Sequence, residues 1–168
     1  PKQTDTLTIF VNSSTHTIQN PNPLKSLAHF LRNDLNLTGT KTVCEEGGCG
    51  ACTILFTSPT SPTPTPINAC LKLLSTCNDC HILTSEGLGS SRTTFHEIQT
   101  TIADNNGTQC GFCTPGMVMS SAALLAENPK PTEAEVRHYL EGNICRCTGY
   151  HNIVKAVLSA SGQTVAAE

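Results

Sequence analysis

The sequence predicts an α+β protein, with β-strands in the first half of the chain and helices in the second. Short alternating runs rich in β-branched residues occur before residue 85, as is typical of strands. Beyond residue 94 the apolar residues recur with helical spacing. The ten cysteines fall into groups in both halves, and their spacing indicates metal ligation rather than a secreted disulfide framework.

The N-terminal segment predicts a β-hairpin followed by a helix. Residues 6–11 and 15–18 alternate like strands, and Asn12-Ser13-Ser14 between them forms a turn. Asn22-Pro23 is a typical helix start, and apolar residues follow at 24, 27, 28 and 31. We therefore expect an amphipathic helix packed on the hairpin.

Two more strands are expected in the first half, over residues 53–57 and 81–84. Between them, residues 58–66 contain four prolines, which favour extended polyproline conformation and predict a surface loop outside helix and sheet. The polar, glycine-containing run 85–91 predicts a linker. These features predict two domains, 1–88 and 89–168.

The second half predicts four short helices, which together imply a small bundle. Phe95, Ile98 and Ile102 mark the first, and Thr114-Pro115 opens a second that runs to about Glu127. Thr132 and Glu135 have the spacing of a capping box that opens the third. The fourth is indicated by the apolar residues at 153, 154, 157 and 158.

The first cysteine group, Cys44, Cys49 and Cys52, has the C-x4-C-x2-C spacing of a plant-type 2Fe-2S ligand loop. Its glycines permit the close backbone approach that an anionic cluster requires. A fourth thiolate must come from elsewhere, and the spacing alone leaves Cys70, Cys77 and Cys80 as alternatives. Structural zinc is the main alternative to a cluster.

A second four-thiolate site is expected at the ends of the predicted helices. Cys110 and Cys113 precede the second helix of this half, whereas Cys145 and Cys147 lie between the third and the fourth. Helix N-termini there would stabilise anionic ligands. A C-x2-C pair with a C-x-C pair is compatible with either zinc or iron–sulfur.

The charge and the distribution of apolar residues argue against several classes of partner. The net charge is −3, and the scattered Lys and Arg residues form no basic cluster, so no nucleic-acid partner is expected. The chain has no run of 18 apolar residues and no recognisable signal segment, so we expect no membrane association and a cytoplasmic location.

Four runs of the sequence together resemble the iron–sulfur portion of the molybdenum hydroxylases, the family of xanthine dehydrogenase, aldehyde oxidase and carbon monoxide dehydrogenase. They are Leu37–Lys41, Glu46–Thr53, Gln109–Gly116 and Gly142–Tyr150. The resemblance implies an N-terminal β-grasp plant-type ferredoxin domain followed by an all-α four-helix bundle. It also implies two 2Fe-2S clusters, the first held by Cys44, Cys49, Cys52 and Cys70, the second by Cys110, Cys113, Cys145 and Cys147. Cys77 and Cys80 are then spare thiols.

The resemblance further implies an electron-transfer role in a larger enzyme. Electrons would pass from a molybdenum centre through both clusters towards FAD, with molybdopterin and FAD in partner subunits or domains of a hetero-oligomer. Gln109 and Cys147 would approach the pterin. The alternatives are a free-standing two-cluster ferredoxin and a zinc-stabilised interaction module. No catalytic residue is expected in this chain.

Overall fold

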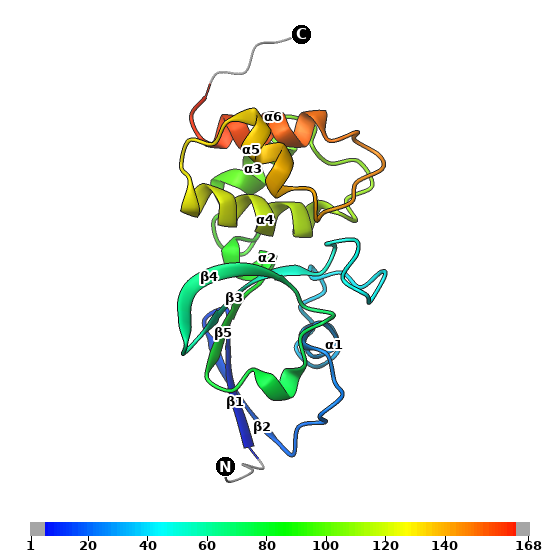
Figure 1. Cartoon of the computed structure of the whole chain (residues 1–168), viewed down its shortest axis with the longest axis vertical. Helices are drawn as coiled ribbons and strands as arrows, with labels where there is room; N and C mark the ends of the chain where they lie inside the picture. The colour runs from blue at the N-terminus through cyan, green and yellow to red at the C-terminus, as the bar shows by residue number, and fades with distance from the viewer. Residues whose placement is uncertain (1–5, 164–168) are drawn as a thin grey trace.

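The computed structural model describes residues 6–163, which form a mixed α+β structure with a five-stranded sheet and several helices. The strand order is β2-β1-β5-β3-β4. In Figure 1 the sheet occupies one end of the molecule and helices α3 to α6 occupy the other, with α4 facing the sheet. The predicted α+β class is confirmed.

The centre of the sheet is made by strands from both ends of the first half. β1 (Thr6–Val11) pairs antiparallel with β2 (Ser14–Gln19), as the hairpin prediction required. On its other side β1 pairs in parallel with β5 (Cys80–Leu83). Every second residue of β1 is buried, so one face of this hairpin covers the core.

The proline-rich segment is a strand, and its prediction as a loop outside the sheet was wrong. β3 (Thr53–Ser58) pairs antiparallel with β4 (Ser61–Asn68), and Pro66 faces Leu55 across the pair. β4 is an edge strand, and proline is tolerated at a sheet edge where its missing N–H would face away from the ladder. The alternation of proline with other residues therefore preserves the pairing with β3.

The first helix begins later than predicted. α1 covers Leu27–His29 and continues as a π-helical turn over Phe30–Asp34. Ser26 is its N-cap and accepts a hydrogen bond from the backbone N–H of His29. Leu24 lies outside the helix, with 83% of its surface exposed. A side-chain cap at Ser26 therefore sets the start, rather than the Asn22-Pro23 signal.

The predicted linker is partly helical. Its first four residues form α2 (Ser85–Leu88), after a short 3-10 turn at Leu74–Thr76 and strand β5. Glu86 binds this segment to the first half, because its Oε1 accepts a hydrogen bond of 2.7 Å from the backbone N–H of Gly39. The domain limits at residue 88 stay a prediction.

The helices of the second half match the predicted positions. They are α3 (Glu97–Asp104), α4 (Thr114–Glu127), α5 (Glu133–Tyr139) and α6 (His151–Ala160). The capping box at Thr132 and Glu135 is present. α4 carries nine consecutive buried residues because it lies between the other helices and β3. Leu55 of β3 belongs to the same apolar core as these helices.

Candidate metal centres

The first cysteine group lies in an irregular loop that leads into β3 and projects from the side of the molecule in Figure 1. The sulfurs of Cys44 and Cys49 are 3.3 Å apart. The loop is tightly wound, with positive φ angles at Glu45, Gly47 and Gly50. At Gly50 a Cβ would lie 2.2 Å from the carbonyl oxygen of Gly142, so only glycine fits there.

Cys70 is the thiol that joins this loop. It neighbours Cys52, whose pKa rises to about 12 through burial and through the adjacent Cys70 thiol. Asn68, two residues before Cys70, holds this segment against the loop by donating from Nδ2 to the carbonyl oxygen of Gly47 at 3.1 Å. Cys77 and Cys80 instead lie in the apolar core of the sheet, 0% and 3% exposed.

The second cysteine group is brought together from two loops at one end of helices α4 and α6. The sulfurs of Cys110 and Cys147 are 3.5 Å apart and both residues are exposed. Cys113 and Cys145 form the inner pair, and burial together with the neighbouring Cys145 raises the pKa of Cys113 to about 12. All four thiols therefore gather at one place, although the chain separates them into two motifs.

Backbone N–H groups point at sulfur in both groups. A hydrogen bond from the backbone of Glu46 and another from the Cys49 thiol lower the pKa of Cys44 to about 7. The backbone of Phe112 and the Cys147 thiol likewise lower the pKa of Cys110. These donors favour the thiolate, the form that binds metal.

The sulfurs are arranged in pairs that suit a two-metal cluster. Two sulfurs on one tetrahedral metal lie about 3.8 Å apart when each metal–sulfur bond is about 2.3 Å. The distances of 3.3 Å and 3.5 Å are close to that value. Within residues 6–163, no three or more Cys, His, Asp or Glu side chains form a site for a single metal ion. Two pairs per group match a 2Fe-2S cluster, in which each iron takes two thiolates.

The two groups adjoin each other. The backbone N–H of Ile144, directly before Cys145, donates to the carbonyl oxygen of Cys49 at 2.9 Å. Asn143 Nδ2 donates to the carbonyl oxygen of Gly50, also at 2.9 Å, while its Oδ1 accepts from Ser120 Oγ at 2.6 Å. A Cβ on Gly116 would lie 2.3 Å from the same Gly50 oxygen, so α4 packs directly on the first loop.

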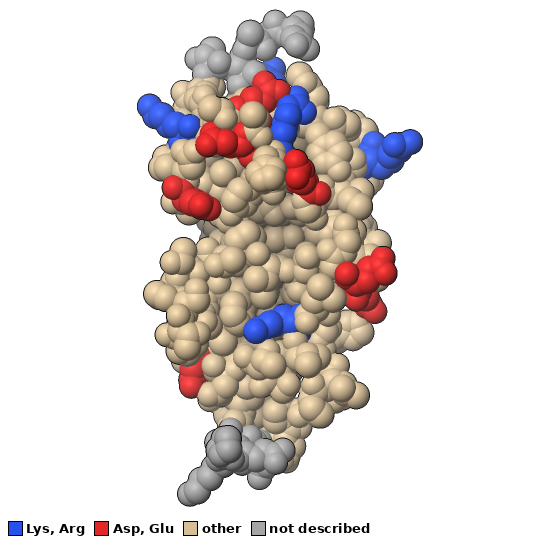
Figure 2. Space-filling view, viewed as in Figure 1, with Lys and Arg blue, Asp and Glu red and all other residues tan. Residues whose placement is uncertain are grey.

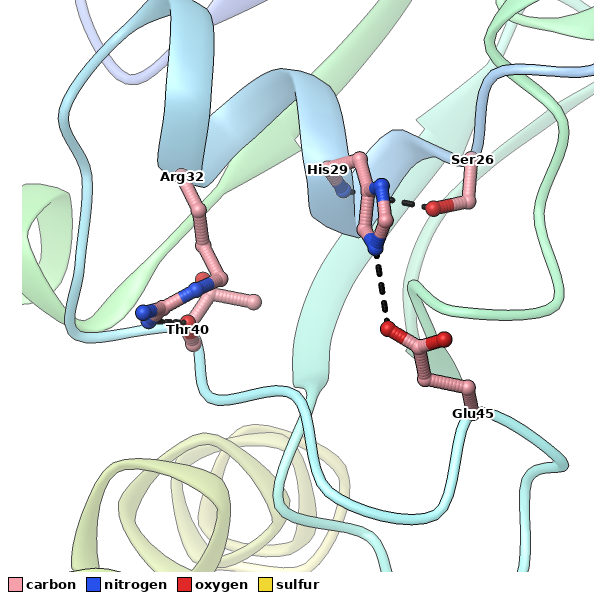
Figure 3. Close-up of polar contacts among 5 residues, drawn as sticks. All are labelled: Ser26, His29, Arg32, Thr40 and Glu45. Carbon is pink, nitrogen blue, oxygen red and sulfur yellow. Dashed lines mark hydrogen bonds and ion pairs between the residues drawn. The ribbon is translucent and has the colours of Figure 1, made fainter.

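Helix α1 braces the first loop from the other side, as Figure 3 shows. His29 Nε2 lies 2.9 Å from Glu45 Oε1, next to Cys44 in the chain. Arg32 donates to the carbonyl oxygen of Thr40 at 2.7 Å, which fixes the entry to the loop. The contact between His29 and Glu45 joins helix α1 to the loop.

The structure leaves Gln109 at the surface, beside the exposed Cys110. Cys147 is exposed as well, on the outer side of the second group. The sequence analysis did not single out Asn143, Ser120 or Tyr150, which connect and support the two groups. The Gly142-Asn143 pair before Cys145 was only a weak sequence signal for this role. The partners of the Asn143 side chain, Ser120 and Gly50, lie more than 20 positions away in the chain.

Comparisons with known proteins agree with this geometry. A family model described as a 2Fe-2S iron-sulfur cluster binding domain matches residues 9–71, and one described as a 2Fe-2S binding domain matches residues 84–158. A chain of quinoline 2-oxidoreductase from Pseudomonas putida 86 superimposes with a TM-score of 0.83 and 36% identity, covering 94% of this chain and 93% of that one.

The chain belongs to the iron–sulfur components of the molybdenum hydroxylases. Aldehyde oxidase 1 and aldehyde oxidase 4 of Cavia porcellus are 46% and 44% identical to it, each over 90% of this chain. An aldehyde oxidoreductase from Desulfovibrio desulfuricans ATCC 27774 has a TM-score of 0.85 at 35% identity, covering 95% of this chain and 17% of its own. This iron–sulfur component spans only 12% of the length of the aldehyde oxidases.

The surface of this iron–sulfur component has no strongly charged face in the view of Figure 2, where acidic and basic side chains are interspersed. Few charges lie at the waist between the sheet and the helices. None of the helices within residues 6–163 is both long and apolar enough to cross a membrane.

Proposed function

We propose that this chain is the electron-transfer part of a molybdopterin-dependent hydroxylase, relaying electrons from a molybdenum centre through two 2Fe-2S clusters towards FAD. The observation that carries the proposal is the hydrogen bond from Ile144 N–H to the Cys49 carbonyl, which joins the two cysteine groups. When bound, such a cluster takes up and releases one electron at a time. Tunnelling is more efficient along bonds and hydrogen bonds than across a gap, so adjoining groups favour a relay.

We assign the ligands in pairs. Cys44 with Cys49 and Cys52 with Cys70 hold the first cluster; Cys110 with Cys147 and Cys113 with Cys145 hold the second. The backbone donors around Cys44 and Cys110 support these thiolates. Cys77 and Cys80 take no part, because their thiols contact neither group: Cys77 Sγ donates to the carbonyl oxygen of Leu73 and Cys80 Sγ to that of Asn78.

The exposed apolar side chains favour a component of a larger assembly over a free-standing ferredoxin. Val43 and Leu71 adjoin the first group and are 58% and 60% exposed; Phe112 and Ile144 adjoin the second and are 50% and 57% exposed. Large apolar residues that surround a functional site mark a contact surface. We propose that a molybdopterin-binding unit covers the second group and an FAD-binding unit the first.

Gln109 and Cys147 are the residues that we propose to approach the pterin. Both are exposed on the outer side of the second group, where a partner could reach them. The amide of Gln109 can both donate and accept hydrogen bonds, which suits the edge of a pterin ring. Cys147 would hold iron at the same time, so the pterin would lie next to a ligand of the second cluster.

The same proposal covers the finer architecture. The five strands with α1 would be a β-grasp plant-type ferredoxin domain within residues 1–88, and helices α3 to α6 a four-helix bundle within residues 89–168. The two apolar cores, one under the sheet and one among the helices, support two domains. A cytoplasmic location is consistent with ten cysteines that form no disulfide.

Metal analysis with matched serine variants tests the ligand assignment. The chain should contain four iron and four acid-labile sulfide, given eight thiolates in two groups. Cys70→Ser should remove only the first cluster, which halves the iron content, whereas Cys77→Ser should keep all of it. Zinc in place of iron would refute the proposal, and loss of the cluster in the Cys77 variant instead of the Cys70 variant would refute the ligand set.

A further inference from the structure

The segment Asn143-Ile144-Cys145, which joins the two cysteine groups, is held by the side chain of Tyr150. The hydroxyl of Tyr150 donates to the carbonyl oxygen of Asn143 at 3.1 Å. The same hydroxyl accepts a hydrogen bond from the backbone N–H of Cys145 at 2.9 Å. One phenol therefore grips the backbone on both sides of Ile144, whose own N–H makes the contact to Cys49.

The backbone at Tyr150 adopts an unusual conformation when its hydroxyl makes these two hydrogen bonds. Tyr150 has a φ of 69°, in the left-handed region that bulky residues rarely adopt, and Gly149 before it has a φ of 62°. Such conformations persist where the surroundings impose them, and they concentrate at functional sites. Here the two residues form the turn that leads into α6, and the Tyr150 hydroxyl reaches back to the backbone of Asn143 and Cys145.

We propose that Tyr150 is a positioning residue for electron transfer between the two sites. This inference rests on the proposed function and deepens it. The Tyr150 hydroxyl fixes the orientation of the Ile144 peptide, so that the Ile144 N–H keeps its hydrogen bond to the Cys49 carbonyl oxygen. This hydrogen bond sets the electronic coupling between the clusters. The transfer moves one electron from the second site to the first; no bond is made or broken and no proton moves.

The positions of the neighbouring contacts distinguish this role from general packing. The Asn143 side chain anchors the segment at Gly50, one residue beyond Cys49, so it holds the two loops together without fixing the peptide of Ile144. Tyr150 contacts the peptides on either side of that residue. Loss of the hydroxyl would leave the loops in contact while letting the Ile144 peptide rotate away from Cys49.

Tyr150→Phe in the complete enzyme tests the proposal, since it removes only the hydroxyl. Tyr139→Phe is the matched control: Tyr139 is the other tyrosine of the chain, and its hydroxyl makes no hydrogen bond to the described residues. After flash reduction, Tyr150→Phe should slow intercluster electron transfer several-fold at unchanged midpoint potentials. Amide hydrogen exchange of Ile144 should accelerate in parallel. The control should change neither.

An unchanged rate, an unchanged Ile144 exchange, or a slower rate explained wholly by shifted potentials would overturn the positioning role. If the Phe variant failed to retain its clusters, exchange in the unaltered enzyme would decide. The Ile144 amide should then be as protected as those inside α4, and exchange as fast as in an exposed loop would refute the proposal. Absence of iron–sulfur absorption from the unaltered enzyme would refute the proposed function itself.

Discussion

Two adjacent serines of α4 should respond in opposite ways to the same substitution. Ser120 Oγ donates to Asn143 Oδ1 at 2.6 Å in a buried position. Ser121 is 0% exposed, and its Oγ has no hydrogen-bond partner within the described part of the chain. Because both lie inside one helix, alanine improves helix propensity at each by about 0.5 kcal/mol. The remaining difference comes from the hydrogen bonds.

The magnitudes follow from the cost of a buried polar group without a partner, about 1–3 kcal/mol. Ser120→Ala leaves the Asn143 oxygen without its donor, so after the gain in propensity we expect a net loss of about 1–2 kcal/mol in the free energy of unfolding. Ser121→Ala removes a hydroxyl that already lacks a partner, so we expect a gain of about 1 kcal/mol or more.

Thermal unfolding followed by far-UV circular dichroism would measure both changes. For a chain of this size about 1 kcal/mol moves Tm by roughly 2–4 °C, so the variants should lie on opposite sides of the unaltered protein. Iron content must match in all samples, because metal loss is coupled to unfolding. In a double-mutant cycle, Ser120→Ala with Asn143→Ala should cost less than the sum of the two. Shifts of equal sign at both serines would refute the reasoning.

Three further predictions follow from other contacts. Gly50→Ala should lower the free energy of unfolding by more than about 2 kcal/mol, because the new Cβ strains a left-handed backbone and collides with the Gly142 carbonyl oxygen. Gly142→Ala is the control: no atom lies within 4 Å of a Cβ there, so its stability in urea unfolding should be unchanged. Glu135→Gln should destabilise α5 at neutral pH. Hydrogen bonds from the backbone N–H and the hydroxyl of Thr132 lower the pKa of Glu135 from its usual value. Its contribution to stability is therefore present above the unfolded-state pKa and is lost as pH falls through the folded-state pKa. Stability curves of the variant and the unaltered protein that stay apart at pH 2 would contradict this. In the complete enzyme, Cys113→Ser should prevent substrate from reducing the first cluster, and rapid-freeze spectroscopy showing reduction at the normal rate would refute the order of electron flow.

The sequence predicted well those features that depend on local signals. The helix that starts after Thr132 was predicted by a capping box whose two residues are three apart, and it forms where expected. The hairpin of β1 and β2 follows from alternation over a few residues. Both cysteine motifs were recognisable because neighbouring residues of a loop supply most of the thiols.

The features that were missed depend on contacts between distant residues. Proline excludes most sheet positions, so β4 could be expected only if its place at the edge were known. Leu24 has the spacing of a helical residue, yet Ser26 captures the helix start two positions later. Asn143 connects the two groups through a hydrogen bond to the carbonyl oxygen of Gly50, which is 93 residues away in the chain. No local pattern contains such information.

The prolines of β4 have a consequence for how the molecule behaves at high concentration. In an antiparallel strand alternate N–H groups face the partner and the outside, and Pro62, Pro64 and Pro66 occupy alternate positions. Since the ladder to β3 is kept, the missing donors belong to the outer set. A stray strand from another molecule would find carbonyl oxygens there but few N–H groups, so β4 protects the sheet against edge-to-edge aggregation.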